Sequence, residues 1–179
     1  MKILIGTRNP GKLREYEALL AGLNLTFLSL RDVDAGDDIP EPYETFAENA
    51  ELKAREYAKR TGMVTLADDS GLVVDALGGR PGVYSARYAP GTDADRYTKL
   101  LGELTGVPAD QRTARFVCAA ALASADGTIL DLQIGTVEGQ IALAPGAGSN
   151  GFGFDPVFIP NGYTVTLNAL TMDEKNAID

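Results

Sequence analysis

Apolar runs alternate with helical patterns along the first part of the chain. KILI at residues 2–5 is a short apolar run typical of a buried strand, and within residues 10–21 apolar positions recur every three or four residues, as on one face of a helix. Asn9 is a suitable N-cap for that helix, and Pro10 suits its first position. The chain is therefore predicted to begin with a strand, a turn and a helix.

A second strand is expected over residues 25–30, and the acidic segment RDVDAGDDIPEPYE then leads to a second helix. Thr45 and Glu48 have the spacing of a capping box, and Gly62 is placed to end the helix. These signals predict a well-bounded helix of about four turns.

The apolar run MVTLA at residues 63–67 predicts a short strand that ends just before Asp68, Asp69 and Ser70. Carboxylates at the carboxyl end of a strand often mark a site in α/β proteins. Asp68 and Asp69 are therefore candidate functional residues.

The second half of the chain indicates antiparallel strands. Asp93 is expected to cap a further helix, and Asp126-Gly127, between two apolar runs, favours a type I′ hairpin turn. Thr171 and Glu174 form another capping box before a last helix. The predicted fold is α/β, with a mixed, partly antiparallel central sheet flanked by helices, two lobes with a cleft between them, and one domain over residues 1–179.

Composition narrows the chemistry. The 179 residues contain no histidine and one cysteine, Cys118, in an apolar run, so histidine bases, histidine metal ligands and the usual triads are excluded. The net charge of −9 argues against nucleic acid or an anionic membrane as the partner. Because no apolar stretch reaches about 18 residues, a soluble cytoplasmic protein is expected.

GTRNPGK, from Gly6 to Lys12, is close to a phosphate-binding P-loop but places Leu13 where the loop needs a hydroxyl. A helix N-terminus with a lysine in its first turn still suits an anion. An ordinary capped helix with a solvated Lys12 is the alternative interpretation.

Three further features are candidates for chemistry. Asp68 and Asp69 could bind Mg²⁺ through oxygen or serve as turn and capping residues, and Glu41 is placed to add a ligand. Lys53 could reach a phosphate or remain solvated. In SNGFGFDP, Phe152 or Phe154 could stack on a base or anchor the loop.

Taken in order, these motifs resemble the inosine/xanthosine triphosphate pyrophosphatase family over nearly all of residues 3–178. The motifs that carry the resemblance are TRNPGK, E-x-x-x-TFAENAELKA, ADDSGLVVDALGGRPGVYSARY, GFGFDPVF and MDEKNAI. EPYETF departs from the family pattern, and Asp179 stands where a final Ser-His-Arg begins. The domain is therefore expected to lack the end of its C-terminal helix.

The resemblance implies a site. Its substrate contacts would be Thr7, Arg8, Asn9, Pro10, Gly11, Lys12, Lys53, Ser70, Phe152, Gly153, Phe154, Asp155 and Lys175. Glu41 and Asp69 would bind Mg²⁺, and Asp69 would also orient or deprotonate the attacking water, with Asp68 in support.

The resemblance also implies the reaction: hydrolysis of unusual purine nucleoside triphosphates (ITP, dITP and XTP) to the monophosphate and pyrophosphate, by a homodimer. Three alternatives stay open. They are a nucleotide-binding protein with weak or no turnover, a P-loop-like phosphotransferase, and a related pyrophosphatase for modified pyrimidine nucleotides.

Overall fold

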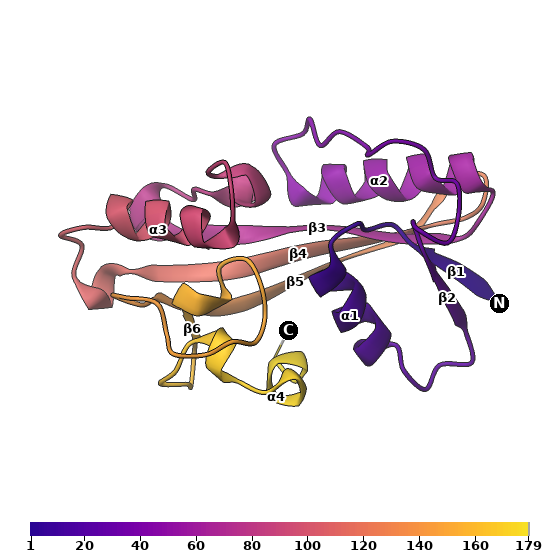
Figure 1. Cartoon of the computed structure of the whole chain (residues 1–179). Helices are drawn as coiled ribbons and strands as arrows, with labels where there is room; N and C mark the ends of the chain where they lie inside the picture. Colours follow the sequence, from indigo (N-terminus) through magenta and orange to yellow (C-terminus); the bar gives the residue numbers. More distant parts are fainter. Residues whose placement is uncertain (179) are drawn as a thin grey trace. The chain divides into compact units, whose positions relative to one another are not determined.

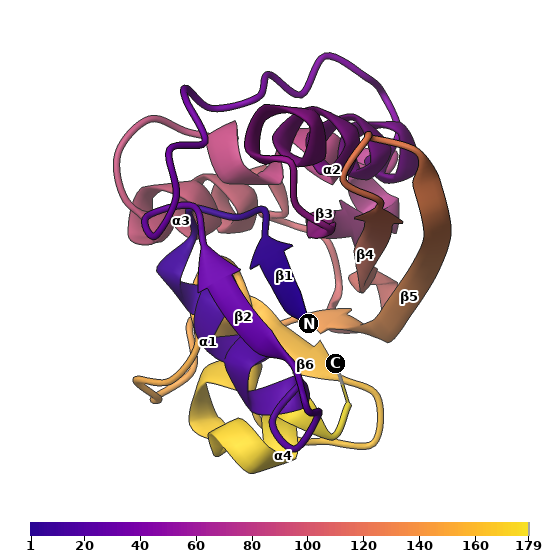
Figure 2. The same ribbon diagram turned by 90° about the vertical axis from the view of Figure 1, so that its right-hand side faces the viewer.

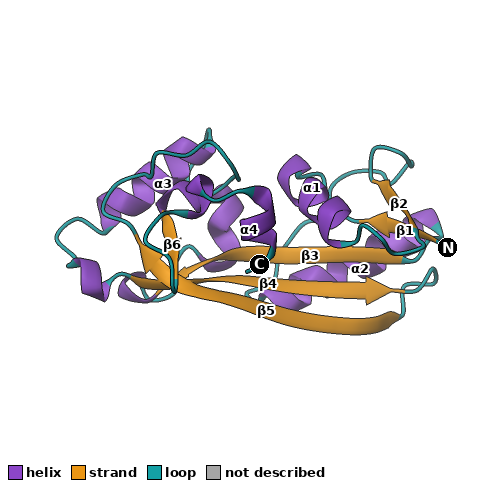
Figure 3. Cartoon of the chain, turned by 90° about the horizontal axis from the view of Figure 1, so that it is seen from below, coloured by secondary structure: helices purple, strands orange, loops and turns teal. Residues whose placement is uncertain are grey.

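The computed structural model describes residues 1–178, and Asp179 lies outside the described residues. Its strands, in sheet order, are β2 (Thr26–Ser29), β1 (Lys2–Ile5), β3 (Thr65–Val74), β4 (Thr113–Ala123), β5 (Ile129–Ile141) and β6 (Phe158–Pro160). β1 is parallel to β2 and β3, whereas β5 is antiparallel to β6. The predicted mixed α/β fold is confirmed (Figure 3).

The α-helices of residues 1–178 are α1 (Pro10–Leu19), α2 (Phe46–Thr61), α3 (Asp93–Glu103) and α4 (Met172–Asn176) (Figure 1). The chain forms two compact units. Unit 1 contains residues 1–69 and 118–134, and unit 2 contains residues 70–117 and the chain from Gly135 onward. None of the helices in the described part of the chain is long and apolar enough to cross a membrane.

In unit 1, the chain passes from β1 to α1 through a close backbone contact at Gly6. The Gly6 N–H donates to the carbonyl of Leu66 at 2.7 Å. A Cβ at position 6 would lie 2.9 Å from the Cβ of Ala67, so only glycine fits without a shift. Asn9 then caps α1 as predicted. Figure 2 shows β1 and β2 side by side.

β3 is ten residues long, so the prediction that a strand over residues 63–67 ends before Asp68 was wrong. Buried carboxylates with polar partners on neighbouring helices can occupy strand positions that the sequence pattern reserves for apolar residues. β1 stops at Ile5, opposite Leu66. Asp68 and Asp69 therefore lie inside β3 but beyond the carboxyl end of β1.

Helix α2 begins and ends where the sequence predicts. The Thr45 hydroxyl accepts the Glu48 N–H at 3.3 Å, and Gly62 closes the helix with φ +65°. The Glu48 carboxylate accepts the Thr45 hydroxyl rather than its N–H, which departs from a full capping box. The buried face of α2 packs its alanines closely on the sheet; this cluster contains Ala50, Ala54, Ala58, Ala67, Ala119, Ala121 and Ala123.

The hairpin between β4 and β5 is present, but its turn is not type I′. In residues 1–178 no residue other than glycine has a positive φ, and Gly127 has φ +87°. The Asp126 carboxylate accepts the Ser124 hydroxyl at 2.5 Å and the Thr128 N–H at 2.9 Å. These hydrogen bonds stabilise a turn in which only Gly127 adopts a left-handed backbone conformation, whereas a type I′ turn needs two such residues.

Unit 2 has the larger side chains in its core, with Leu72, Leu100 and Phe158 fully buried. Helix α3 is capped by Thr92, not by Asp93 as predicted. Thr92 and Asp95 form a reciprocal capping box that satisfies two backbone donors, which one aspartate cannot do. The capping box at Thr171, which starts α4, is confirmed.

Candidate active site

The turn between β1 and α1 contains the first group of predicted substrate contacts. The Asn9 side chain accepts hydrogen bonds from the N–H groups of Gly11 at 2.8 Å and Lys12 at 3.4 Å, and the Thr7 hydroxyl accepts the Asn9 N–H at 3.1 Å. Pro10 has no N–H to offer. Because these donors are used within the turn, an anion bound here would depend mainly on side chains.

Lys12 forms an ion pair with Asp68 on β3. Its Nζ lies 2.5 Å from Asp68 Oδ2, and the Asp68 side chain is 2% exposed. Burial acts to lower the pKa of Lys12, but the Asp68 carboxylate outweighs this effect and the pKa is raised. Lys12 is thus a half-buried, protonated positive charge held by a carboxylate, and the alternative of a solvated Lys12 was wrong.

Asp69 follows Asp68 directly and points to the opposite face of β3, toward α2. Its Oδ2 accepts a hydrogen bond from Asn49 Nδ2 at 2.9 Å. Burial and the neighbouring Glu41 carboxylate raise the pKa of Asp69, although Asn49 and the lysines oppose the shift. A carboxylate with a raised pKa is suited to accept a proton from water.

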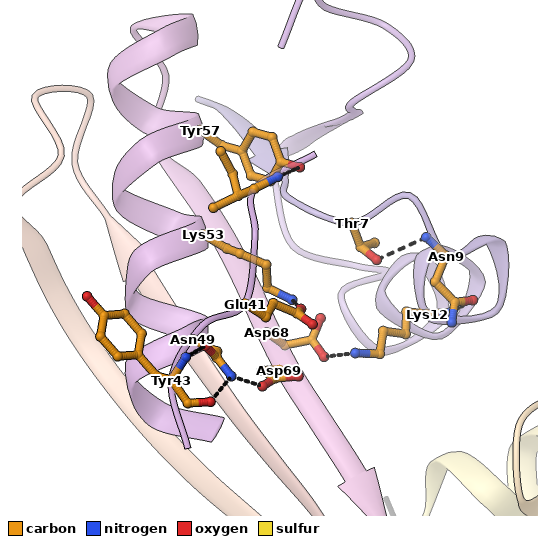
Figure 4. Close-up of polar contacts among 11 residues, drawn as sticks. Thr7, Asn9, Lys12, Glu41, Tyr43, Asn49, Lys53, Tyr57, Asp68 and Asp69 are labelled. Atoms are coloured by element: carbon orange, nitrogen blue, oxygen red, sulfur yellow. Dashed lines mark hydrogen bonds and ion pairs between the residues drawn. The ribbon is translucent and has the colours of Figure 1, made fainter. Parts of the chain in front are cut away.

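Glu41 and Lys53 form a second ion pair beside Asp69. Lys53 Nζ donates to Glu41 Oε1 at 2.6 Å, and the Lys53 side chain is only 13% exposed, so the alternative of a solvated Lys53 was also wrong. Figure 4 shows Glu41 and Lys53 gathered with Asp68, Asp69 and Lys12. The structure therefore brings two lysines and three carboxylates together within unit 1.

Glu41 and Asp69 fit a magnesium ion. Repulsion between the two carboxylates contributes to the raised pKa of Asp69, and a bound cation would relieve it. Residues 1–178 contain no group of three or more His, Cys, Asp or Glu side chains arranged to hold a metal. Mg²⁺ is commonly bound by one or two carboxylates together with water and substrate phosphates, so two protein ligands are sufficient.

Two other predicted substrate contacts are Arg8 and Ser70. Arg8 pairs with Asp38 and donates to the carbonyl of Gly36 at 2.5 Å, so it is engaged with the acidic segment (residues 31–44). Ser70 lies in β3, half-buried, as the first residue of unit 2.

Unit 2 brings together the predicted contacts to the base. Lys175 Nζ donates to Asp155 Oδ2 at 2.7 Å and lies 4.7 Å from the centre of the Phe152 ring. The Asp155 carboxylate also accepts the Phe152 N–H at 2.9 Å, and the Gly153 N–H donates to Asp93 at 2.7 Å. Together these contacts fix the loop that carries Phe152.

The Phe154 side chain belongs to the core. It is 4% exposed and packs edge-on against Tyr88, with 6.4 Å between the ring centres. Of the two loop aromatics, Phe152 is therefore the one whose ring is available to a planar base.

Two further residues contact the site without having been predicted as part of it. Asn49 is fully buried against Asp69. Tyr16 lies one helical turn after Lys12, and its pKa is raised by burial and by Asp68. The available signals were weak: an asparagine one turn before Lys53 on α2, and a tyrosine one turn after Lys12 on α1.

The chain is similar to proteins of one family along almost its whole length. The Ham1 family model matches residues 3–179. The chain is 49% identical to a dITP/XTP pyrophosphatase of Exiguobacterium sibiricum, over 99% of this chain and 90% of that protein. It is 50% identical to the protein of the same name from Geobacillus kaustophilus, over 99% and 87%.

Solved structures of similar proteins lead to the same family. A HAM1 protein from Coxiella burnetii superposes with a TM-score of 0.88 at 41% identity, covering 100% of this chain and 91% of that one. A Mycobacterium abscessus protein described as a nucleoside-triphosphatase and dITP/XTP pyrophosphatase gives a TM-score of 0.80 at 44% identity, covering 99% and 93%. Sequence and fold thus lead to the same conclusion: the chain belongs to the Ham1 family.

Proposed function

We propose that this protein hydrolyses dITP, ITP and XTP to the corresponding monophosphate and pyrophosphate, and so removes them from the nucleotide pool. The observation that carries the proposal is the group of two half-buried, ion-paired lysines and three carboxylates in unit 1. The names of the relatives support the choice of substrates.

In this proposal water attacks the α-phosphorus and pyrophosphate leaves. Asp69 orients the water and accepts its proton, while Lys12 and Lys53 donate their remaining ammonium hydrogens to phosphate oxygens. Glu41 and Asp69 would hold Mg²⁺, which would supply positive charge to offset the negative charge of the triphosphate. Phe152 stacks on the base, and Asp155 and Lys175 provide polar contacts to it. The proposed contacts are completed by Thr7, Arg8, Asn9, Pro10, Gly11, Ser70 and Gly153, while Phe154 anchors the loop that carries Phe152.

Pyrophosphate release from dITP, XTP, dGTP and ATP tests the proposal directly. We expect turnover of dITP and XTP with Mg²⁺, and loss of turnover when EDTA removes the metal. Nucleotide binding without pyrophosphate release would favour the non-catalytic alternative. Transfer of phosphate to an acceptor would favour a phosphotransferase.

We also propose a cytoplasmic homodimer. Family membership supports the dimer, and light scattering of the purified chain in solution tests it. A mass equal to that of one chain across the micromolar range would contradict this proposal.

A further inference from the structure

The side chain of Asn49 connects two parts of the candidate site. Its Nδ2 donates to Asp69 Oδ2 at 2.9 Å and to the backbone carbonyl of Tyr43 at 3.2 Å, while its Oδ1 accepts the Tyr43 N–H at 3.0 Å (Figure 4). The residue is 0% exposed. These partners fix the amide's orientation, because a flipped amide would turn its oxygen toward the Asp69 carboxylate.

Tyr43 belongs to the acidic segment, which also carries Glu41. Side chains on one face of α2 bind this segment at several points. Lys53 binds Glu41 at 2.6 Å, the Tyr57 hydroxyl accepts the Ile39 N–H at 3.4 Å, and Arg60 donates to the carbonyls of Ala35 and Asp37 at 3.2 and 2.7 Å. Asn49 differs from Tyr57 and Arg60 in that it binds both the segment and Asp69.

We propose that Asn49 is a positioning residue that holds the Asp69 carboxylate and the Glu41-bearing segment in fixed relation, so that the two carboxylates can share one divalent cation. The roles of Asp69 and Glu41 rest on the proposed function. Groups that orient metal ligands commonly change metal affinity or activity by about 10- to 100-fold when they are removed.

A purely structural role for Asn49 makes a different prediction. Asn168 in unit 2 illustrates such a role, because it is also buried and donates to the carbonyls of Gly146 and Gly148 at 3.1 and 2.9 Å. Loss of a backbone clamp lowers stability but leaves the geometry of distant carboxylates unchanged. Metal affinity and kcat therefore distinguish the two roles, whereas stability does not.

The test compares Asn49→Ala with Tyr57→Phe, which removes a contact from the same helix to the same segment without touching Asp69. The readouts are thermal unfolding, Mn²⁺ affinity in the absence of nucleotide, and kcat and KM for dITP. We expect Asn49→Ala to weaken Mn²⁺ binding and to lower kcat by about 10- to 100-fold each, with KM changed less than kcat. Tyr57→Phe should keep Mn²⁺ affinity and kcat within about threefold of the parent chain.

A folded Asn49→Ala variant with unchanged Mn²⁺ affinity and kcat would overturn the proposal, whatever its melting temperature. If Asn49→Ala does not fold, Asn49→Ser decides by the same readouts, because its hydroxyl leaves a smaller cavity and keeps a polar group. A parent chain that binds Mn²⁺ but does not hydrolyse dITP would count against the proposed function. The Mn²⁺ affinities of the variants would then still decide the role of Asn49.

Discussion

Asp68 and Asp69 are adjacent in sequence, yet the pleat of β3 gives them different partners. Asp68 is neutralised by Lys12, whereas Asp69 meets the neutral Asn49 and the like charge of Glu41. A carboxylate in a strong ion pair is a poor proton acceptor because its charged form is already stabilised. The different partners therefore favour Asp69 as the base.

Asp69→Asn is expected to lower kcat for dITP by about 100-fold or more, because the amide cannot accept the proton of the attacking water. The side chain keeps its size, so the protein should remain folded. Steady-state kinetics together with circular dichroism check both parts. Turnover close to that of the parent chain would mean that another group is the base.

Asp68→Asn is expected to act mainly on stability, because it removes the buried carboxylate that neutralises the half-buried charge of Lys12. Removing one member of a buried ion pair typically costs about 3 kcal/mol of unfolding free energy. Urea unfolding measures the loss, and Lys12→Met in the Asp68→Asn background should recover most of it. Equal stability of Asp68→Asn and the parent chain would show that the pair contributes little.

At the scale of elements, helix α2 serves the core on one face and the site on another. Its alanines allow close packing on the sheet, while Asn49, Lys53, Tyr57 and Arg60 bind the acidic segment. Since one rigid helix carries both faces, the position of the segment is tied to the packing of the core.

The β4–β5 hairpin gives a prediction about pH. Hydrogen bonds from the Ser124 hydroxyl and the Thr128 N–H lower the pKa of Asp126 to about 2. Because this value lies below the unfolded one, the carboxylate stabilises the fold above about pH 4 and loses that effect as the pH falls toward 2. Asp126→Asn should therefore melt below the parent chain at pH 6, with the difference shrinking toward zero near pH 2. A pH-independent difference would contradict this assignment.

At the scale of the whole molecule, the sequence predicted those features that depend on residues close to one another along the chain. The Asn9 cap, the ends of α2 and the Thr171 capping box each depend on residues within a few positions. The contact between Lys12 and Asp68 spans 56 positions and that between Asn49 and Asp69 spans 20, so no local pattern contains them. The length of β3 was missed for the same reason.

The last prediction concerns the unfolding of the chain as a whole. β3, β4 and β5 each contribute residues to both compact units, so unfolding one unit interrupts strands that the other unit needs.

Leu4 in unit 1 and Phe158 in unit 2 are both fully buried. Leu4→Ala and Phe158→Ala should each cost about 3 to 5 kcal/mol and lower one shared calorimetric transition. The calorimetric and van't Hoff enthalpies should agree for both variants. Two separate transitions, each shifted by only one of the substitutions, would show instead that the units unfold independently despite their shared strands.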